Sequence, residues 1–306
     1  MKVLIATEKP FARTAVDGIC RIIEESGHTP VLLEKYTDKA QLLEAVVDAD
    51  ALIVRSDIID AEVIAAAPDL KIIVRAGAGY DNIDLSAASA RGIVVENTPG
   101  QNSNAVAELV FGMLVMAVRN MYNGTSGTEL KGRRLGIHAF GQVGRNVARI
   151  AKGFGMEVSA LDPYCAPEAM IEAGVKPVTD IKELYRDNDV VSLHIPATDE
   201  TRGSVGYELV TLMPKGGVLV NTARKEVIDE AGLNKALEAR PDLRYVADVR
   251  PACAEDLVRE FPDRVFFTPK KMGAQTAEAN INAGLAAASQ TVDFLNNGNV
   301  SFRVNK

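Results

Sequence analysis

The chain has 306 residues, 47% of them hydrophobic and 25% charged, which is the composition of a typical globular protein. This length favours two domains, because a single hydrophobic core stops growing near about 250–300 residues. The net charge of -7 argues against a protein that binds the nucleic-acid backbone, which requires a basic face, but it leaves a small anionic ligand open.

Cysteine usage and hydropathy bear on the compartment. The three cysteines, Cys20, Cys165 and Cys253, include no close pair, so neither a disulfide framework nor a zinc site is expected. The apolar run at residues 2–6 is too short for a secretory signal peptide. No apolar stretch reaches about 20 residues without a charge or a glycine, so we expect a cytoplasmic protein with no membrane span and no metal ion.

The N-terminal third alternates between short β-branched runs and amphipathic stretches. The predicted strands cover residues 2–7, 31–34, 51–55, 70–74 and 93–97, and the predicted helices cover 12–26 and 39–48. This alternation predicts a parallel sheet with helices on both of its faces.

A clear turn at residues 97–100 separates this series from a second one. After the turn, Ser103 is the expected N-cap of a long apolar helix over 105–121, which must be buried in the core or in a subunit interface. A second strand–helix series runs from residue 134 to about 273, and an apolar helix over 276–295 closes the chain. The sequence therefore predicts two doubly wound units, joined near Pro99 and again near Gly273.

A glycine-rich motif lies between a predicted strand over 134–138 and a predicted helix over 145–154. It is the G-x-G-x-x-G pattern with alanine in its first place, and it reads Ala139-Phe140-Gly141-Gln142-Val143-Gly144. Gly141 would let the backbone approach a pyrophosphate, and Gly144 would let the helix pack close to the strand. Ala139 fits the opening turn if its φ is negative.

Asp162 ends the next predicted strand, which covers residues 158–161. A carboxylate at this place bonds to the hydroxyls of the adenosine ribose and repels a 2′-phosphate, so the pattern predicts NAD rather than NADP. The alternative is an ordinary glycine turn followed by a strand-end aspartate, and the correct order of strand, helix and acid argues against it.

Several stretches together resemble the D-2-hydroxyacid dehydrogenase family. They are residues 75–84, 92–99, 104–109, 193–196 and 220–224. The stretch 54–56 also matches the branch of the family that oxidises 3-phospho-D-glycerate, the first step of serine biosynthesis. The resemblance extends over nearly the whole chain.

The resemblance implies an α/β fold of two Rossmann-like, doubly wound parallel-sheet domains with the substrate in an interdomain cleft. The substrate-binding, flavodoxin-like domain would comprise residues 1–98 and 274–306, and the NAD-binding Rossmann domain residues 99–273. The helix from Ala105 implies a homodimer. The end of the chain near residue 306 would leave no room for the C-terminal regulatory domain that some members carry, and the segment 121–130 is shorter than is usual in the family.

The motif and the resemblance together imply two sets of binding residues. The expected cofactor contacts are Ala78, Gly141, Gln142, Val143, Gly144, Asp162, His194, Ile195, Pro196, Thr222, Ala223, Asp248, Gly273 and Ala274. The expected substrate contacts are Arg55, Ser56, Arg75, Gly77, Ala78 and Asn102. The arginines at two successive strand ends suit a doubly anionic hydroxyacid, although strand-end arginines can also serve only solubility.

Arg224 matches the family arginine that holds the substrate carboxylate, for which a planar guanidinium is suited. The family base is a histidine, and this chain has Lys270 and Lys271 in its place. Alignment backwards from Gly273 selects Lys271, our preference, whereas alignment forwards from Thr268 selects Lys270.

The glutamate that usually pairs with that histidine is replaced by Cys253, and Glu255 lies out of register. A lysine must lose its proton to act as a base, and a carboxylate neighbour would oppose this, whereas burial and a nearby arginine would favour it. The two replacements together therefore predict a lysine base. The alternative is a solvated basic turn in an inactive site.

Two other functions stay open. One is a reductase of glyoxylate, hydroxypyruvate or another D-2-hydroxyacid, which would not need the two arginines for a phosphate. The other is a non-enzymatic, NAD-sensing binding protein, which the missing histidine and glutamate would suit.

Overall fold

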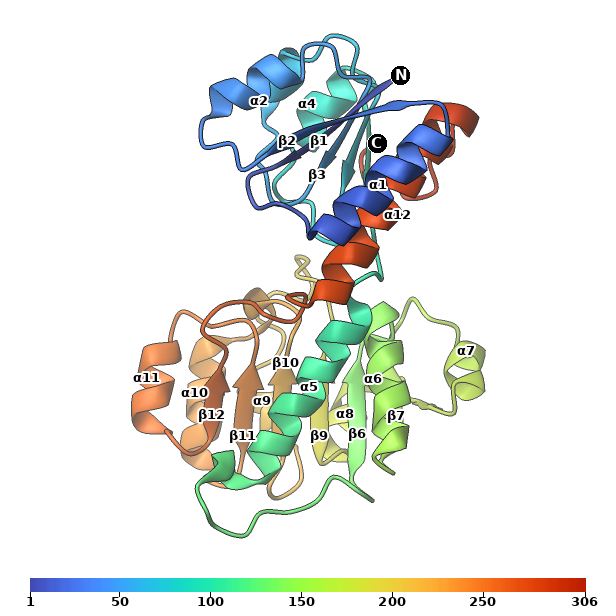
Figure 1. The fold of residues 1–306 in the computed structure, drawn as a ribbon. Helices are drawn as coiled ribbons and strands as arrows, with labels where there is room; N and C mark the ends of the chain where they lie inside the picture. Colours follow the sequence, from blue (N-terminus) through green and yellow to red (C-terminus); the bar gives the residue numbers. More distant parts are fainter. The chain divides into compact units, whose positions relative to one another are not determined.

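The structure is a computed structural model that describes residues 1–306, and the chain divides into two compact units (Figure 1). The first unit contains Met1–Asn102 and Thr276–Lys306, and the second contains Ser103–Gln275. None of the helices is both long enough and apolar enough to cross a membrane.

The first unit is built on a parallel sheet of five strands in the order β2-β1-β3-β4-β5. Its elements in chain order are β1 (Lys2–Thr7), α1 (Arg13–Glu25), β2 (Thr29–Glu34), α2 (Lys39–Ala45), β3 (Ala51–Val54), α3 (Ala61–Ala65), β4 (Ile72–Arg75), α4 (Leu85–Ala90), β5 (Val94–Asn97) and, from the end of the chain, α12 (Ala277–Asn297). Helices α1 and α12 cover one face of the sheet, and α2, α3 and α4 cover the other (Figure 1). Because both faces are covered, the central strands are continuous apolar runs, as in Ala51–Val54.

The last residues of the chain cover the edge of this sheet. The backbone N–H of Val304 donates to the carbonyl of Val95 at 2.8 Å. The buried amide of Asn305 accepts from the N–H of Val95 and donates to the carbonyl of Ile93, both at 2.8 Å. These bonds satisfy the backbone of edge strand β5, which would otherwise be open to pairing with another chain.

The second unit contains a parallel sheet of seven strands in the order β12-β11-β10-β9-β6-β7-β8. Its elements are α5 (Ser103–Val118), η1 (Asn120–Tyr122), β6 (Arg134–His138), α6 (Gln142–Gly153), β7 (Glu157–Leu161), α7 (Pro167–Glu172), β8 (Lys176–Pro177), α8 (Ile181–Arg186), β9 (Val190–Leu193), α9 (Tyr207–Val210), β10 (Val218–Asn221), η2 (Lys225–Val227), α10 (Glu230–Ala239), β11 (Arg244–Ala247), α11 (Ala254–Glu260) and β12 (Val265–Phe267). Helices α5 and α6 pack on one face, and α8 to α11 pack on the other (Figure 1). The predicted fold class, two doubly wound parallel-sheet units, is confirmed.

Side-chain caps fix where many helices begin. The carboxylates of Asp60, Asp84 and Asp229 each accept an N–H from the first turn of the helix that follows. Asp38 forms a capping box with Gln41. These bonds satisfy N–H groups that have no partner within the helix.

Helix α5 differs from its prediction at both ends. Ser103 is the first residue of the helix rather than the residue before it, and the helix ends at Val118. Asn120, Met121 and Tyr122 then adopt left-handed backbone conformations, with φ values of 52°, 53° and 59°. This turn holds because the Asn120 amide donates to the loop that follows and accepts from Arg244 at 2.7 Å, contacts that periodicity does not reveal.

Candidate active site

The glycine-rich turn joins β6 to α6 at the carboxyl edge of the seven-stranded sheet. A Cβ on Gly144 would lie 2.4 Å from the carbonyl oxygen of Ala139, so the helix could not pack this closely with any other residue. No atom lies within 4 Å of the place that a Cβ on Gly141 would occupy, so the backbone is open there. The helix has no side-chain N-cap, and its first residues, Gln142 and Val143, leave backbone N–H groups available to a phosphate.

The φ of Ala139 is +81°, so the condition of a negative φ under which alanine would fit this turn is not met. The chain turns from strand to helix here while the N–H of Ala139 bonds to the carbonyl of Leu161 at 2.9 Å. That turn requires the left-handed conformation, which a glycine adopts freely and an alanine adopts at a cost of about 1–2 kcal/mol.

Asp162 follows β7 and fixes the glycine turn from the side. Its Oδ2 accepts the N–H of Phe140 and its Oδ1 accepts the N–H of Tyr164, both at 2.8 Å. Each carboxylate oxygen has a second lone pair, which a ribose hydroxyl could use. The turn and the acid therefore fit the adenosine half of NAD.

Two histidines lie at the switch point of the sheet, where β6 and β9 are neighbours although they are distant in sequence. His138 ends β6 and contacts the hydroxyl of Tyr185 at 3.4 Å, and His194 follows β9 and contacts the hydroxyl of Ser192 at 2.9 Å. Burial lowers the pKa of His138 to about 4, although the charge of Asp162 opposes this shift. Burial first, and the neighbouring His138 second, lower the pKa of His194 to about 3. Both imidazoles are therefore neutral near pH 7, and neither is a ready proton acceptor.

The next strand ends carry further expected cofactor contacts. Ile195 is buried and Pro196 is exposed after β9. After β10, Ala223 is buried, and the hydroxyl of Thr222 is buried without any hydrogen-bond partner. Buried polar groups in proteins are nearly always bonded, so this hydroxyl at the carboxyl edge fits a site that receives a polar ligand.

Asn221 shapes the turn that carries Arg224. Its Oδ1 accepts the N–H of Ala223, and its Nδ2 donates to the carbonyl of Arg224, both at 2.9 Å. The half-buried guanidinium of Arg224 donates to the carbonyl of Ala223 at 2.9 Å and forms no ion pair. Most of its donors are thus available to an anion.

Asp248 anchors the loop in which the lysines lie. The carboxylate is buried and accepts the hydroxyl of Thr268 at 2.8 Å, the N–H of Met272 at 2.6 Å and the N–H of Gly273 at 2.8 Å. The carboxylate thus holds the backbone of the loop that follows β12. A Cβ on Gly273 would lie 3.0 Å from this carboxylate, which explains the glycine.

Lys270 and Lys271 lie inside the anchored loop, and both side chains are exposed. Ala274, after the loop, is half-buried. The structure thus gives the two lysines a fixed backbone without a buried setting.

Cys253 and Glu255 have different surroundings. Glu230 accepts the N–H of Ala252 at 2.8 Å and the N–H of Cys253 at 2.9 Å. Burial and a hydrogen bond to Glu230 raise the pKa of the Cys253 thiol to about 12, so the thiol stays protonated. Glu255 is exposed and pairs with Arg250. Sequence analysis missed Glu230, whose only signal was its place beside the capping residue of α10.

The remaining candidates lie on the first unit. They are Arg55, Ser56, Arg75, Gly77, Ala78 and Asn102. Among these, Ser56 and Ala78 are exposed, and Asn102 is half-buried.

Arg55 follows β3 and is tied to its own unit. Its Nη1 donates to the carbonyls of Lys9 and Pro10 at 2.9 and 3.0 Å, and its Nη2 donates to Asn280 at 2.5 Å. The guanidinium carbon lies 5.1 Å from the centre of the Phe11 ring. These contacts leave few donors free for a ligand.

Arg75 ends β4 and has more donors free. Its Nε donates to the carbonyl of Arg55 at 3.0 Å, and neither arginine forms an ion pair. Burial and then the charge of Arg55 lower the pKa of Arg75. A Cβ on Gly77 would lie 1.3 Å from Nη1 of Arg75, so only a glycine leaves room for the guanidinium in this position. Two neighbouring cations that form no ion pair make a site that an anion would stabilise, although the charges of Asp57 and Asp81 partly offset them.

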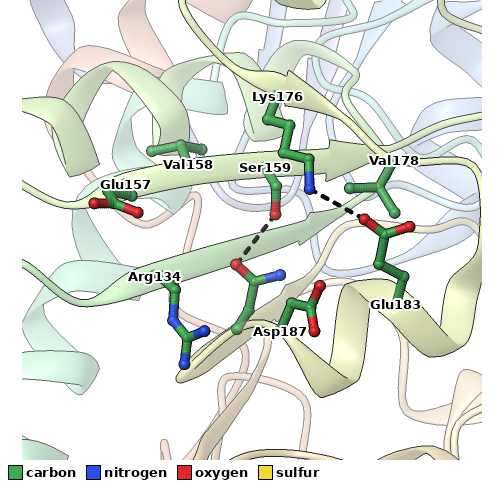
Figure 2. Close-up of a pocket in the computed structure, with 9 residues that line it drawn as sticks. Arg134, Glu157, Val158, Ser159, Lys176, Val178, Glu183 and Asp187 are labelled. Atoms are coloured by element: carbon green, nitrogen blue, oxygen red, sulfur yellow. Dashed lines mark hydrogen bonds and ion pairs between the residues drawn. The ribbon is translucent and has the colours of Figure 1, made fainter.

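A pocket of about 410 Å³, lined mainly by charged and polar residues, opens at the opposite edge of the seven-stranded sheet, near the first residues of β6 and β7 (Figure 2). Inside it, Lys176 pairs with Glu183 at 3.1 Å, and the hydroxyl of Ser159 donates to Asn188 at 3.1 Å (Figure 2). Nucleotides bind outside the carboxyl ends of parallel strands, so this pocket is separate from the cofactor site.

Comparison with known proteins identifies the family. Residues 111–269 match the family described as D-isomer specific 2-hydroxyacid dehydrogenase, NAD binding domain. A crystal structure of cofactor (NAD+)-bound 3-phosphoglycerate dehydrogenase from Entamoeba histolytica is 50% identical, with a TM-score of 0.87, and the match covers 100% of this chain and 99% of that one.

Two curated relatives extend the comparison. D-3-phosphoglycerate dehydrogenase of Methanocaldococcus jannaschii is 38% identical over 288 residues, which are 88% of this chain and 54% of that protein. Hydroxypyruvate reductase of Thermotoga maritima is 36% identical over 273 residues, which are 82% of this chain and 86% of that protein. The chain spans about half the length of the curated phosphoglycerate dehydrogenases it matches first. It belongs to the D-isomer specific 2-hydroxyacid dehydrogenase family of NAD-dependent oxidoreductases, and its residues 111–269 are the NAD-binding domain of that family.

Proposed function

We propose that this chain oxidises 3-phospho-D-glycerate to 3-phosphohydroxypyruvate with NAD, the first step of serine biosynthesis. The observation that carries the proposal is the pair Arg55 and Arg75, two neighbouring cations at strand ends that form no ion pair, although the charges of Asp57 and Asp81 act on them. A phosphorylated hydroxyacid has a second anionic group that such a pair would bind. The names of the Entamoeba histolytica and Methanocaldococcus jannaschii relatives support the same substrate.

Within the pair, the geometry favours different roles. Arg75 has both terminal nitrogens uncommitted, so we propose that it binds the substrate anion. Arg55 donates to two carbonyls and to Asn280, so it holds the loop and adds positive charge.

Arg224 is the proposed anchor for the substrate carboxylate. Asn221 fixes its backbone through two hydrogen bonds, and its guanidinium has free donors. A guanidinium held in this way can orient the acid in two-point geometry and stabilise the negative charge on the carbonyl oxygen as it forms. NAD, when bound, supplies the carbon that accepts the hydride.

The hydroxyl proton must leave as the hydride leaves the carbon, and we propose a lysine as its acceptor. Both candidate bases, Lys271 and Lys270, lie in the loop that Asp248 anchors. Lys271 is preferred because alignment backwards from Gly273 selects it. The histidines at the switch point are neutral and bonded elsewhere, and Cys253 stays protonated, which leaves the lysines as the candidate bases. A lysine takes the proton only as the free amine, so activity should rise toward alkaline pH.

The test follows NADH formation from 3-phosphoglycerate and NAD between pH 6 and 10. We expect turnover to rise on the alkaline side. Replacement of the working lysine, in K271A or K270A, should lower kcat by about 10²–10⁴-fold and remove the alkaline rise. The exposed Lys215, in a distant turn, gives the matched control K215A, which should behave as the unchanged protein. If both loop variants keep normal turnover, the lysine base is wrong.

The second candidate is reduction of hydroxypyruvate or glyoxylate, which the Thermotoga maritima relative favours. R75Q separates the two functions, because only a phosphorylated substrate needs this cation for a second anionic group. The reductase would be selected if the unchanged protein turns over unphosphorylated acids but not 3-phosphoglycerate, and if R75Q turns over the unphosphorylated acids at the same rate. NADH binding without turnover of any hydroxyacid would select an NAD-sensing protein.

A homodimer through α5 is part of the same proposal. The exposed side of this helix carries Asn104, Glu108 and Gly112, and the half-buried apolar residues Leu109 and Met116 lie beside them. Light scattering after size exclusion would measure the mass in solution, and a monomeric mass at micromolar concentration would contradict the dimer. A cytoplasmic location remains a prediction of the sequence.

A further inference from the structure

The loop between α5 and β6 lies at the amino edge of the seven-stranded sheet, where β6 and β11 begin (Figure 1). Hydrogen bonds bring its two ends together. The N–H of Thr128 donates to the carbonyl of Val118 at 2.8 Å, and the side-chain amide of Asn120 donates to the carbonyl of Ser126 at 3.0 Å. The Oδ1 of Asn120 and the hydroxyl of Thr128 therefore lie on neighbouring parts of one closed loop.

Two arginines from different strands attach to this loop. Arg244 is the first residue of β11, and its Nη2 donates to Oδ1 of Asn120 at 2.7 Å. Arg133 directly precedes β6, and its Nη2 donates to the hydroxyl of Thr128 at 2.8 Å. Strands β9 and β10 lie between β6 and β11 in the sheet, so it is the closed loop that brings the two side chains toward one place.

Both guanidinium groups keep most of their donors unused. The Nε of Arg244 is buried and has no hydrogen-bond partner, and neither arginine forms an ion pair. Burial first, and the charge of Arg133 second, lower the pKa of Arg244. The charge of Asp189 interacts with Arg133, but this carboxylate is already paired with Arg134 at 3.0 Å. Two neighbouring cations with spare donors form a site that an anion would stabilise.

We propose that Arg133 and Arg244 form a binding site for a phosphate group at the amino edge of the seven-stranded sheet. A guanidinium presents parallel N–H donors that match two oxygens of a phosphate, and two guanidinium groups balance the charge of the dianion. The glycine turn and Arg224 lie at the carboxyl edge of the same sheet, so this site is separate from the cofactor site. The inference does not depend on the proposed reaction.

The experiment uses a reporter beside the site. The chain contains no tryptophan, so Y122W places a single tryptophan in the exposed part of the turn that Arg244 holds. Titration with inorganic phosphate at pH 8 and constant ionic strength, without NAD or hydroxyacid, should change its fluorescence in a saturable way. In this background R133Q and R244Q should each weaken phosphate binding by about tenfold or more, because charged hydrogen bonds are lost.

The matched control is R149Q, which removes an exposed arginine of the same unit that donates to the neutral side chain of Asn104 at 2.6 Å. It should bind phosphate as tightly as Y122W alone. Phosphate affinities of R133Q and R244Q that equal the affinity of R149Q overturn the inference.

A second measurement needs neither the reporter nor R244Q, whose lost bond to Asn120 can destabilise the turn. A ligand that binds the folded state raises the melting temperature, so phosphate in place of chloride should stabilise the unchanged protein. The rise should be smaller in R133Q than in R149Q, and equal rises in the two variants overturn the inference. Absence of turnover of 3-phosphoglycerate would contradict the proposed reaction and leave this site standing.

The bound phosphate group has two sources, free phosphate and a phosphorylated metabolite. The loss of affinity in R133Q is therefore measured with inorganic phosphate and with glycerol 3-phosphate. Equal losses assign the site to free phosphate, because nothing beyond the phosphate group is then recognised. A larger loss with glycerol 3-phosphate assigns it to a phosphorylated metabolite.

Discussion

At the carboxyl edge of the five-stranded sheet the charged candidate groups are two arginines, whereas at the same edge of the seven-stranded sheet they include two carboxylates. Arg55 and Arg75 use some donors on backbone carbonyls and form no ion pair. Asp162 and Asp248 use their oxygens on backbone N–H groups. The first edge has two arginines without an ion pair, which suits an anion. At the second edge the two carboxylates hold two turns in place through backbone hydrogen bonds.

Breaking the best-bonded carboxylate should have the largest effect. D248A leaves the N–H groups of Met272 and Gly273 without this acceptor, while the Thr268 hydroxyl keeps the backbone carbonyl of residue 248, and each unmet donor costs about 1–3 kcal/mol. We expect the free energy of unfolding to fall by about 3 kcal/mol or more, which corresponds to a loss of roughly 10 °C for a unit of this size. Thermal unfolding followed by circular dichroism measures this. A melting temperature within two degrees of the unchanged protein would show that the anchor does not stabilise the loop.

The arginine edge should respond in substrate binding. R75Q removes the cation with free donors, so KM for 3-phosphoglycerate should rise about 10–100-fold with little change in melting temperature. R55Q removes three hydrogen bonds to its own unit as well as a charge, so it should lower the melting temperature too. Steady-state kinetics and melting curves of the two variants test this division. Equal losses of stability would contradict the different roles.

Glu96 provides the opposite case to Asp248, because it is a buried carboxylate with a single hydrogen bond, from the N–H of Phe302 at 3.3 Å. Burial first, and the charge of Asp293 second, raise its pKa above the ordinary value. An acid whose pKa is raised by folding contributes full stability below its ordinary pKa, and this contribution is lost as the pH rises through the folded value. E96Q has no charge to bury, so it should stabilise the protein by about 1 kcal/mol at pH 8.

The pH dependence identifies the cause. The advantage of E96Q over the unchanged protein should shrink to near zero at pH 4, where Glu96 is protonated in both the folded and the unfolded state. Melting temperatures of the two proteins at pH 4, 6 and 8 measure the difference. An effect of E96Q that is the same at all three pH values would show that the buried charge is not responsible.

The strands could be predicted because their apolar runs are local. The strands over Lys2–Thr7 and Arg134–His138 have the predicted bounds, and the alternation with helices gave the parallel sheets. Short elements such as β8 (Lys176–Pro177) and α9 (Tyr207–Val210) were not predicted, because a few residues carry no measurable period.

The candidate residues could be located at strand ends from motifs, but their bonding could not. No spacing in the sequence shows that the terminal nitrogens of Arg55 donate to the carbonyls of Lys9 and Pro10, while Arg75 donates only through Nε. Nor does it show that Glu230 accepts from the backbone at Cys253, since those residues meet only after β10 and β11 pair. Such contacts depend on tertiary packing between distant segments, and they decide which side chains remain available to a ligand.

The smallest expected change in stability is at the glycine turn, where the strained residue Ala139 follows β6. Ala139 has a φ of +81°, and glycine adopts this conformation without the clash of a Cβ. A139G should relieve about 1–2 kcal/mol of strain, part of which is offset because glycine makes the unfolded chain more flexible. We expect a net gain of about 0.5–1 kcal/mol, seen as a rise of a few degrees in melting temperature. NADH affinity should stay within about twofold if Asp162 fixes the turn on its own through the N–H of Phe140. A loss of stability in A139G would mean that the methyl group of Ala139, which packs against the cluster of Leu193 and Ile195, contributes more than its backbone strain costs.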